Sequence, residues 1–363
     1  MMKRLLLSVV MLMAGSGAAG ADVTSPRPPI EPVLERMLVT YIRPGYAGFN
    51  LSVSGLSTAT RALCETPSGD RLGAARAAFR AAADSWARIE WLRLGPVMSH
   101  NRLERVLFFP DRKGTGRKQV QSAIAQKDAS VTDAGSLAGQ SVAMQGLGAI
   151  EFLLFGSGSD ALAHSKASHR CAFAHAAADN LVNLSNEIIT GWGPDSTAVP
   201  VFLKPGADNP LYRTDTEALN VLLGQMIHGL EAIRDTRIGA FLDTENPDHD
   251  RPKSALFWRS EMTLPTIRAG LSGLEALFNA SGIEVVAEDQ APKLAAMIRF
   301  EFSQAIRTAD SLDAPVAELL ADPQTREKLA YLAYAIKIII ARLDQEFAQA
   351  GGLAVGFSFG DGD

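Results

Sequence analysis

The sequence predicts an all-α protein built from two helical lobes packed together. Apolar residues recur at spacings of three and four, which is typical of helices that bury one face. The clearest stripes run through residues 70–92, 215–240 and 325–349. Strong helix formers such as Ala, Leu, Arg, Glu and Gln fill the positions between, and strand-like alternation is nearly absent.

Residues 1–21 have the pattern of a signal peptide. Lys3 and Arg4 precede the apolar run LLLSVVMLMAG, and Ala19-Gly20-Ala21 fits the small-x-small rule for cleavage after Ala21. No later apolar stretch reaches the roughly 18 residues that a membrane span needs. The sequence therefore predicts an exported, periplasmic protein with no transmembrane segment.

A chain of 363 residues is long enough for two domains. Residues 194–213 contain four prolines and no helical stripe, so we interpret them as a linker between an N-terminal lobe (22–193) and a C-terminal lobe (214–363). The segments GLGAIEFLLFG (146–156) and GLEAIRDTRIG (229–239) share a short pattern, which is consistent with a distant internal duplication.

Charge and cysteine content narrow the functional classes. The formal net charge is −5, and removal of Lys3 and Arg4 takes it to −7, which argues against a nucleic-acid partner. The two cysteines, Cys64 and Cys171, predict a disulfide in an oxidising compartment. The alternative is a pair of buried free thiols.

The most unusual segment is SVAMQGLGAIEFLLFG, residues 141–156. A helix of this composition is apolar on nearly every face and is therefore buried. Glu151 is its one ionisable residue, and a buried carboxylate needs a partner, a metal or a proton. Two interpretations stay open: a site carboxylate, or a structural Glu paired with an Arg from another helix. Gly146 and Gly148 would let a backbone or a ligand approach one turn earlier.

These residues resemble the G-x-H-x-x-E motif of the imelysin family, whose helix ends in a run like FLLWG. Gly146 and Glu151 match the motif, whereas its His is replaced by Gly148. Other similar blocks are WARIEWLRLGP, RVLFFPD, RPKSALFWRSEMTLPTIRAGLSGLEAL and the closing GFSFGDGD. The blocks occur in the family's order from about residue 30 to the C-terminus.

The resemblance implies two helical lobes with the motif near their interface, an exported protein, and a link to iron acquisition in some members. Some members are classed as metallopeptidases. Loss of the motif His removes the imidazole ligand for a transition metal, and a catalytic zinc needs about three protein ligands. Iron or another divalent metal is thus a weakened expectation, and we favour a protein that is not an enzyme and has no catalytic residue.

We expect a periplasmic ligand-binding or accessory protein linked to iron acquisition, with its site at the lobe interface. Its partner would be a small ligand or a periplasmic or outer-membrane iron-uptake protein. The alternatives are a metal-dependent peptidase and a helical protein–protein adaptor. The ligand-binding candidates are Glu90, Arg93, Arg105, Gly146, Gly148, Glu151, Trp258, Arg259 and Asp361. Among the arginines, which pair well with carboxylates, Arg105 is the first expected partner of Glu151.

Overall fold

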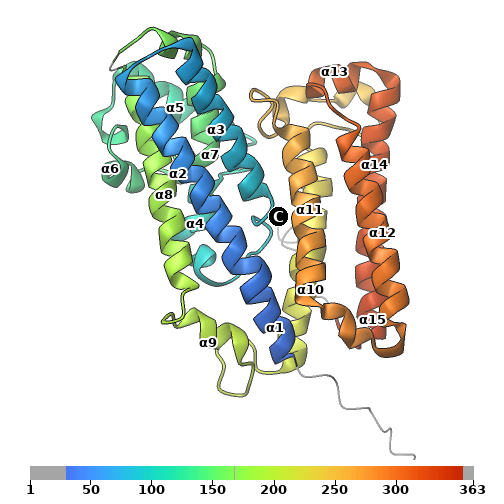
Figure 1. The fold of residues 1–363 in the computed structure, drawn as a ribbon. Helices are drawn as coiled ribbons and strands as arrows, with labels where there is room; N and C mark the ends of the chain where they lie inside the picture. The colour runs from blue at the N-terminus through green and yellow to red at the C-terminus, as the bar shows by residue number, and fades with distance from the viewer. Residues whose placement is uncertain (1–29, 167, 355–363) are drawn as a thin grey trace, which may run out of the picture.

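The computed structural model describes residues 30–166 and 168–354, and these residues form helices and turns without any strand (Figure 1). The all-α prediction is confirmed. The first helices are α1 (Glu31–Met37), α2 (Arg43–Glu65), α3 (Gly69–Ala87), α4 (Arg102–Val106), α5 (Thr115–Gln126), α6 (Ala134–Ala138), α7 (Gly146–Phe155), α8 (His169–Gly191) and α9 (Ala198–Leu203). The later helices are α10 (Asp215–Glu231), α11 (Thr263–Ser281), α12 (Ala291–Asp310), α13 (Val316–Ala321), α14 (Pro323–Ala341) and α15 (Ala348–Ala350).

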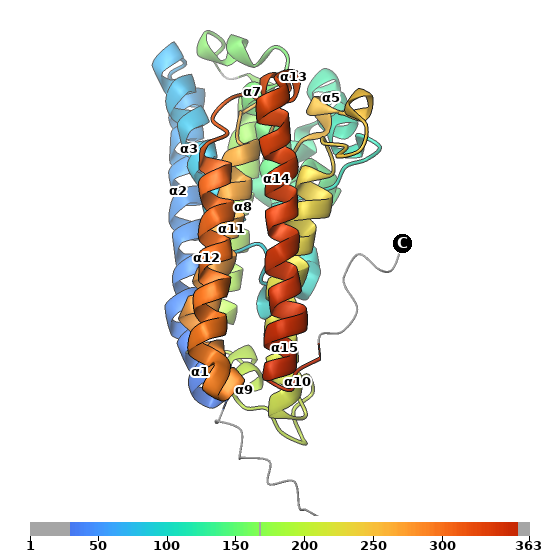
Figure 2. The ribbon, with the colours of Figure 1, turned by 90° about the vertical axis from the view of Figure 1, so that its right-hand side faces the viewer.

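The long helices gather in two groups that lie side by side (Figure 1). In the first group α2 packs against α3 and α8, and in the second α12 packs against α11 and α14. Figure 2 shows α12 and α14 next to each other along most of their length. Helix α11 also contacts α1 and α3, so it joins the two groups.

The predicted apolar stripes form the core of these helices. Phe79, Ala82, Ala83 and Trp86 of α3 are all buried, and the ring of Trp86 lies 4.9 Å from that of Phe49 in α2. The stripes of α10 and α14 are buried in the same way, through residues such as Leu223, Met226, Leu332 and Ile336. Burial of each of the larger apolar side chains, such as Phe79 or Leu223, contributes roughly 1.5–3 kcal/mol, which explains why the helical period alone predicts the helices.

Hydroxyl and carboxylate side chains fix where several helices begin. Ser68, Ser168 and Thr214 accept a hydrogen bond from the backbone N–H three residues later, at the starts of α3, α8 and α10. Asp322 does the same for α14. Such caps satisfy a backbone donor that has no partner inside the helix.

The predicted linker 194–213 contains a short helix, α9, which the sequence did not indicate. Its Val199 and Phe202 are buried, and Phe202 packs edge-on against Trp192 at 5.5 Å between ring centroids. Pro200 lies in the first turn, where its missing N–H costs no helical hydrogen bond, so proline content hid the helix. The lobe boundaries and the internal duplication stay predictions.

Cys64 and Cys171 form a disulfide, as the sequence predicted. The bond joins the end of α2 to the start of α8, two helices that also pack against each other. Among the described residues, no helix is long and apolar enough to cross a bilayer.

Replacement of both cysteines by alanine is expected to lower the free energy of unfolding by about 2–4 kcal/mol, because the bond closes a loop of 107 residues in the unfolded chain. Denaturant unfolding with and without reductant measures the loss, and reductant should affect only the wild type. Mass spectrometry of unreduced, alkylated native protein checks the bond directly. Two alkylated cysteines would contradict it.

Candidate functional site

Helix α7 enters the core through a glycine at a position that leaves no room for a side chain. Gly146 has φ +68°, and an added Cβ would lie 2.2 Å from the carbonyl oxygen of Val106 and 2.4 Å from that of Arg105. The preceding Gln145 is buried, and its Oε1 accepts hydrogen bonds from Arg105 and Asn180. These contacts fix the position at which α7 begins.

Two arginines satisfy the carbonyl groups at the other end of α7. Arg170 donates to the carbonyl oxygens of Phe152, Leu153, Gly156 and Ser157 at 2.6–3.2 Å. Arg76 donates to the carbonyl oxygen of Leu154 at 2.8 Å. The positive charges also favour the negative end of the helix dipole. A nearly all-apolar helix is thereby buried without stranded carbonyl groups.

Glu151 projects from α7 and is buried, with a side chain that is 7% exposed. Its Oε1 accepts hydrogen bonds from the backbone N–H of Arg259 at 3.0 Å and from the N–H and hydroxyl of Ser260, both at 3.1 Å. Its Oε2 lies 3.7 Å from Nη1 of Arg259. The sequence predicted that Glu151 has an Arg or a hydroxyl partner. The structure shows one of each, Arg259 and Ser260, both in the segment that precedes α11.

The segment that holds Glu151 has an unusual backbone. Phe257 and Glu261 have φ +58° and +61°, a region that bulky side chains rarely adopt. The turn is held by hydrogen bonds from the Met262 N–H to the Phe257 carbonyl and from the Thr263 hydroxyl to the Leu256 carbonyl. This conformation directs the amides of residues 259 and 260 at one carboxylate oxygen.

Burial raises the pKa of Glu151, while the charge of Arg259 and the hydrogen bonds from Ser260 and Arg259 act in the opposite direction. A carboxylate accepting several N–H and O–H bonds is favoured in its ionised form. Burial of the Glu151 carboxylate therefore costs free energy, and the donors of Arg259 and Ser260 offset that cost.

Arg105, the partner that we ranked first, lies elsewhere. Its guanidinium donates to Gln145 at 3.1 Å and to Asn180 at 3.3 Å. The ranking was wrong because Arg105 belongs to α4, which supports the start of α7, whereas Glu151 lies more than one turn further along. Arg105 therefore supports the start of α7, whereas Arg259 and Ser260 bind Glu151 further along that helix.

A cavity of about 660 Å³ opens beside Glu151. Its walls come from residues 108–120, from residues 143–152 and from residues 235–259. Gly148, Glu151, Trp258 and Arg259 line it, which brings together four of the candidate residues. No described atom lies within 4 Å of a Cβ placed on Gly148, so the position of the family's His faces open space.

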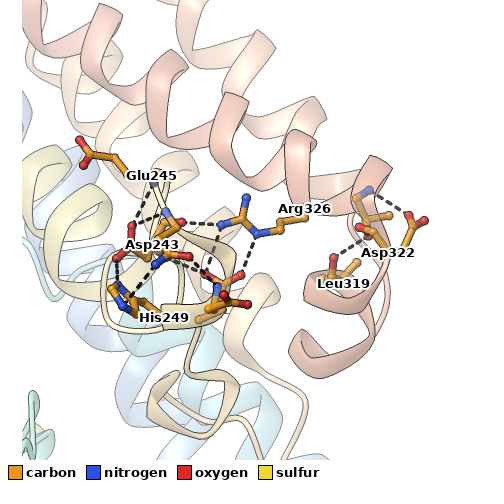
Figure 3. A network of polar contacts seen from close by, with 10 residues as sticks. Asp243, Glu245, His249, Leu319, Asp322 and Arg326 are labelled. Carbon is orange, nitrogen blue, oxygen red and sulfur yellow. Dashed lines mark hydrogen bonds and ion pairs between the residues drawn. The ribbon is translucent and has the colours of Figure 1, made fainter.

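A network of polar contacts braces the cavity wall that carries Arg251 and Lys253 (Figure 3). Arg326 of α14 donates to Asp250 at 2.7 Å and to the carbonyl oxygen of Asp243 at 2.5 Å. Asp243 accepts hydrogen bonds from the N–H groups of Glu245 and Asn246, which lower its pKa. The turn is therefore tied both to itself and to α14.

The remaining candidates lie outside the cavity lining. Glu90 forms a buried ion pair with Arg237 at 2.7 Å, and the Arg237 guanidinium lies over the Phe109 ring at 4.6 Å. The Arg93 N–H donates to Gln225 at 2.6 Å. Gly146 and Arg105 support α7, as described above, and Asp361 lies outside the described residues. Glu90 and Arg237 form a second buried charge contact between the two helix groups.

The surroundings of Glu151 do not fit a metal ion. Its Oε1 accepts hydrogen bonds from two backbone N–H groups and from the Ser260 hydroxyl, and its Oε2 lies 3.7 Å from the Arg259 guanidinium, which is positively charged and cannot ligate a metal ion. In residues 30–166 and 168–354, no three His, Cys, Asp or Glu side chains converge in a way that could hold a metal. We therefore derive no metal chemistry from this site.

Several residues of the site could not be predicted from the sequence. Ser260 follows Arg259 directly, but only the turn geometry shows that its N–H and hydroxyl meet Glu151. The basic cavity residues of RKGTGRK (112–118) were not predicted, because this short basic segment stands in a chain whose net charge is negative. The signal in the sequence that could have indicated a basic site was four cationic residues within seven positions, separated by glycines.

The fold and the site define an all-helical protein in which a buried carboxylate lines a cavity. The family model for imelysin (Peptidase_M75) matches residues 42–343. The chain belongs to the imelysin family, as the motif blocks predicted.

Named relatives and solved structures agree with this assignment. "Iron-regulated protein A" of Synechococcus elongatus is 23% identical over 350 residues, covering 93% of this chain and 90% of the relative. An imelysin-like protein from Psychrobacter arcticum 273-4 has a TM-score of 0.72 at 18% identity, over 91% of this chain and 98% of its own. A candidate iron-regulated protein A precursor from Parabacteroides distasonis ATCC 8503 has a TM-score of 0.70 at 14% identity, over 89% and 97%.

Replacement of Glu151 by alanine is expected to lower the free energy of unfolding by about 3–5 kcal/mol, because it strands the Arg259 charge and the Ser260 donors. Glu151→Gln should cost less, since the amide keeps one acceptor oxygen. Glu187→Ala is the control and should cost less than about 1 kcal/mol, because Glu187 is half exposed and its partner Arg102 keeps hydrogen bonds to the carbonyls of Pro96 and Ser99. A Glu151→Ala variant that unfolds like wild type would remove the basis for this site.

The two glycines of the motif region should respond oppositely to alanine. Gly146→Ala is expected to cost at least about 2 kcal/mol, because its Cβ meets two carbonyl oxygens and its φ is positive. Gly148→Ala should be neutral or stabilising by up to about 1 kcal/mol, because its Cβ has free space and alanine favours helix. Thermal or denaturant unfolding of both variants tests the contrast, and equal effects would refute it.

Proposed function

We propose that this protein is an exported, periplasmic ligand-binding accessory protein of iron acquisition, and that its ligand occupies the cavity beside Glu151. The observation that carries the proposal is the cavity itself, whose volume of about 660 Å³ lies in the range typical of small-molecule sites. A cavity lined by many polar and charged residues favours the ligand-binding function over a protein–protein adaptor, which would need a flat surface.

The proposed place of the cavity is the interface between an N-terminal lobe and a C-terminal lobe. In support, its walls are drawn from residues 108–152 on one side and 235–259 on the other. Ligands commonly bind where two structural units meet. Glu151 then acts from α7 as a support that holds the opposite wall, through Arg259 and Ser260, at a fixed distance.

The proposed cellular role draws on the relatives. Two of them carry the name iron-regulated protein A, and one of these is described as a precursor. The predicted signal peptide, with cleavage after Ala21, agrees with export, and the disulfide fits an oxidising compartment. Cell fractionation and mass analysis of the mature N-terminus would test the location.

A cavity-filling substitution tests the role. Gly148→Trp should abolish function without unfolding the protein, because a side chain at this position enters open space. The matched control is Gly55→Trp, an exposed helix glycine that also has nothing within 4 Å of its Cβ. In a deletion strain of the host grown under iron limitation, wild type and Gly55→Trp should restore growth and Gly148→Trp should not.

Immunoblots must show equal protein levels for the three forms. A deletion strain that grows normally under iron limitation would overturn the link to iron. Full restoration by Gly148→Trp would instead show that the cavity beside Glu151 is not the functional site.

A further inference from the structure

The cavity carries an excess of positive charge that the proposed function does not explain. Seven basic residues line the cavity and only three carboxylates do, although the chain has a formal net charge of −5. The basic residues of the lining are Arg112, Lys113, Arg117, Lys118, Arg251, Lys253 and Arg259. The cavity therefore opposes the overall charge of the protein.

Each lining carboxylate already has partners within the protein. Asp111 accepts hydrogen bonds from the N–H groups of Thr115 and Gly116 at 2.6 and 3.0 Å. Asp235 forms a two-point contact with Arg234, both distances being 2.6 Å. Glu151 is held by Arg259 and Ser260, so all three lining carboxylates take part in contacts within the protein.

The cations behave differently. Arg259 alone among them pairs with a carboxylate of the described chain, and the other six form no ion pair or side-chain hydrogen bond to residues 30–166 or 168–354. All six are exposed to solvent. Four of them line the cavity from residues 112–118, and the other two, Arg251 and Lys253, follow the turn that Arg326 braces (Figure 3).

Two further features shape the cavity. Helix α5 begins at Thr115 beside the lining residues Gly114 and Gly116, so the positive end of its dipole lies at the cavity, where Asp111 accepts hydrogen bonds from two of its N–H groups. The guanidinium of Arg259 lies 4.3 Å from the centre of the Trp258 ring, which gives one wall an apolar face. Concave sites lined by one sign of charge concentrate the field at the ligand position.

We propose that the ligand of this cavity is a compact anion with at least two carboxylate or phosphate groups. The proposal rests on the proposed ligand-binding function and specifies its chemistry. Guanidinium groups bind both kinds of anion through two parallel hydrogen bonds, and ammonium groups add charge without fixed geometry. The cavity volume suits a small molecule.

Calorimetric titration of the full mature chain with citrate, with inorganic pyrophosphate and with uncomplexed ferrous ion tests the proposal. We expect at least one of the two anions to bind one to one, more weakly as salt is added. The double variant Arg117→Glu/Lys253→Glu should weaken this binding at least about tenfold, which corresponds to about 1.4 kcal/mol.

The control is Lys293→Glu/Lys337→Glu, which changes the net charge equally at exposed positions outside the cavity. It should keep the affinity within about twofold, and all variants should melt like wild type. Binding of citrate alone would indicate a carboxylate ligand, and binding of pyrophosphate alone a phosphate ligand. Either result supports the proposal.

Failure of both anions to bind, or an equal loss in both double variants, would overturn it. If ferrous ion binds, Gly148→Trp abolishes that binding and neither anion binds, the ligand-binding function stands while the anion proposal falls. If an anion binds as expected but the deletion strain grows normally under iron limitation, the anion site stands while the link to iron falls.

Discussion

The structure depends on how the buried carboxylate of Glu151 is neutralised. An ionised group in an apolar helix is tolerated only if donors replace the water that it loses. Those donors belong to Arg259 and Ser260, more than a hundred residues away in the chain. Packing of α7 and the conformation of the turn before α11 are therefore coupled, because neither is satisfied without the other.

A second buried pair repeats this arrangement at another point. Glu90 follows α3 and contacts Arg237, which lies in the π-helical turn Ala232–Ile238 after α10. Buried ion pairs contribute little net stability compared with apolar packing, but removal of one partner is costly. Two such contacts therefore favour one relative arrangement of the helix groups over the others that apolar surfaces alone would allow. The same contacts fix the shape of the cavity, because its walls come from residues 108–152 and 235–259.

The sequence predicted the helices well because apolar residues recur at helical spacing within each one, and those residues are the ones that the core buries. It also predicted Glu151 as a buried group that needs a partner, because a single charge in an apolar helix has few alternatives. It did not predict which arginine would serve, since that depends on the turn at Phe257–Glu261, where positive φ values have no sequence period. Helix α9 was missed for a related reason: four prolines dominate a segment in which two buried residues decide the conformation.

The replacement of the motif His by Gly148 has a physical meaning in this setting. A glycine there leaves open space in the cavity lining and supplies no imidazole, while Oε1 of Glu151 accepts three hydrogen bonds and Oε2 lies 3.7 Å from the Arg259 guanidinium, so neither residue is arranged to hold a cation. Within the cavity lining, the three carboxylates have partners in the protein, whereas six of the seven basic residues form no ion pair with the described residues. The charge that the lining leaves unpaired is therefore positive, which is the sign that the proposed anion requires.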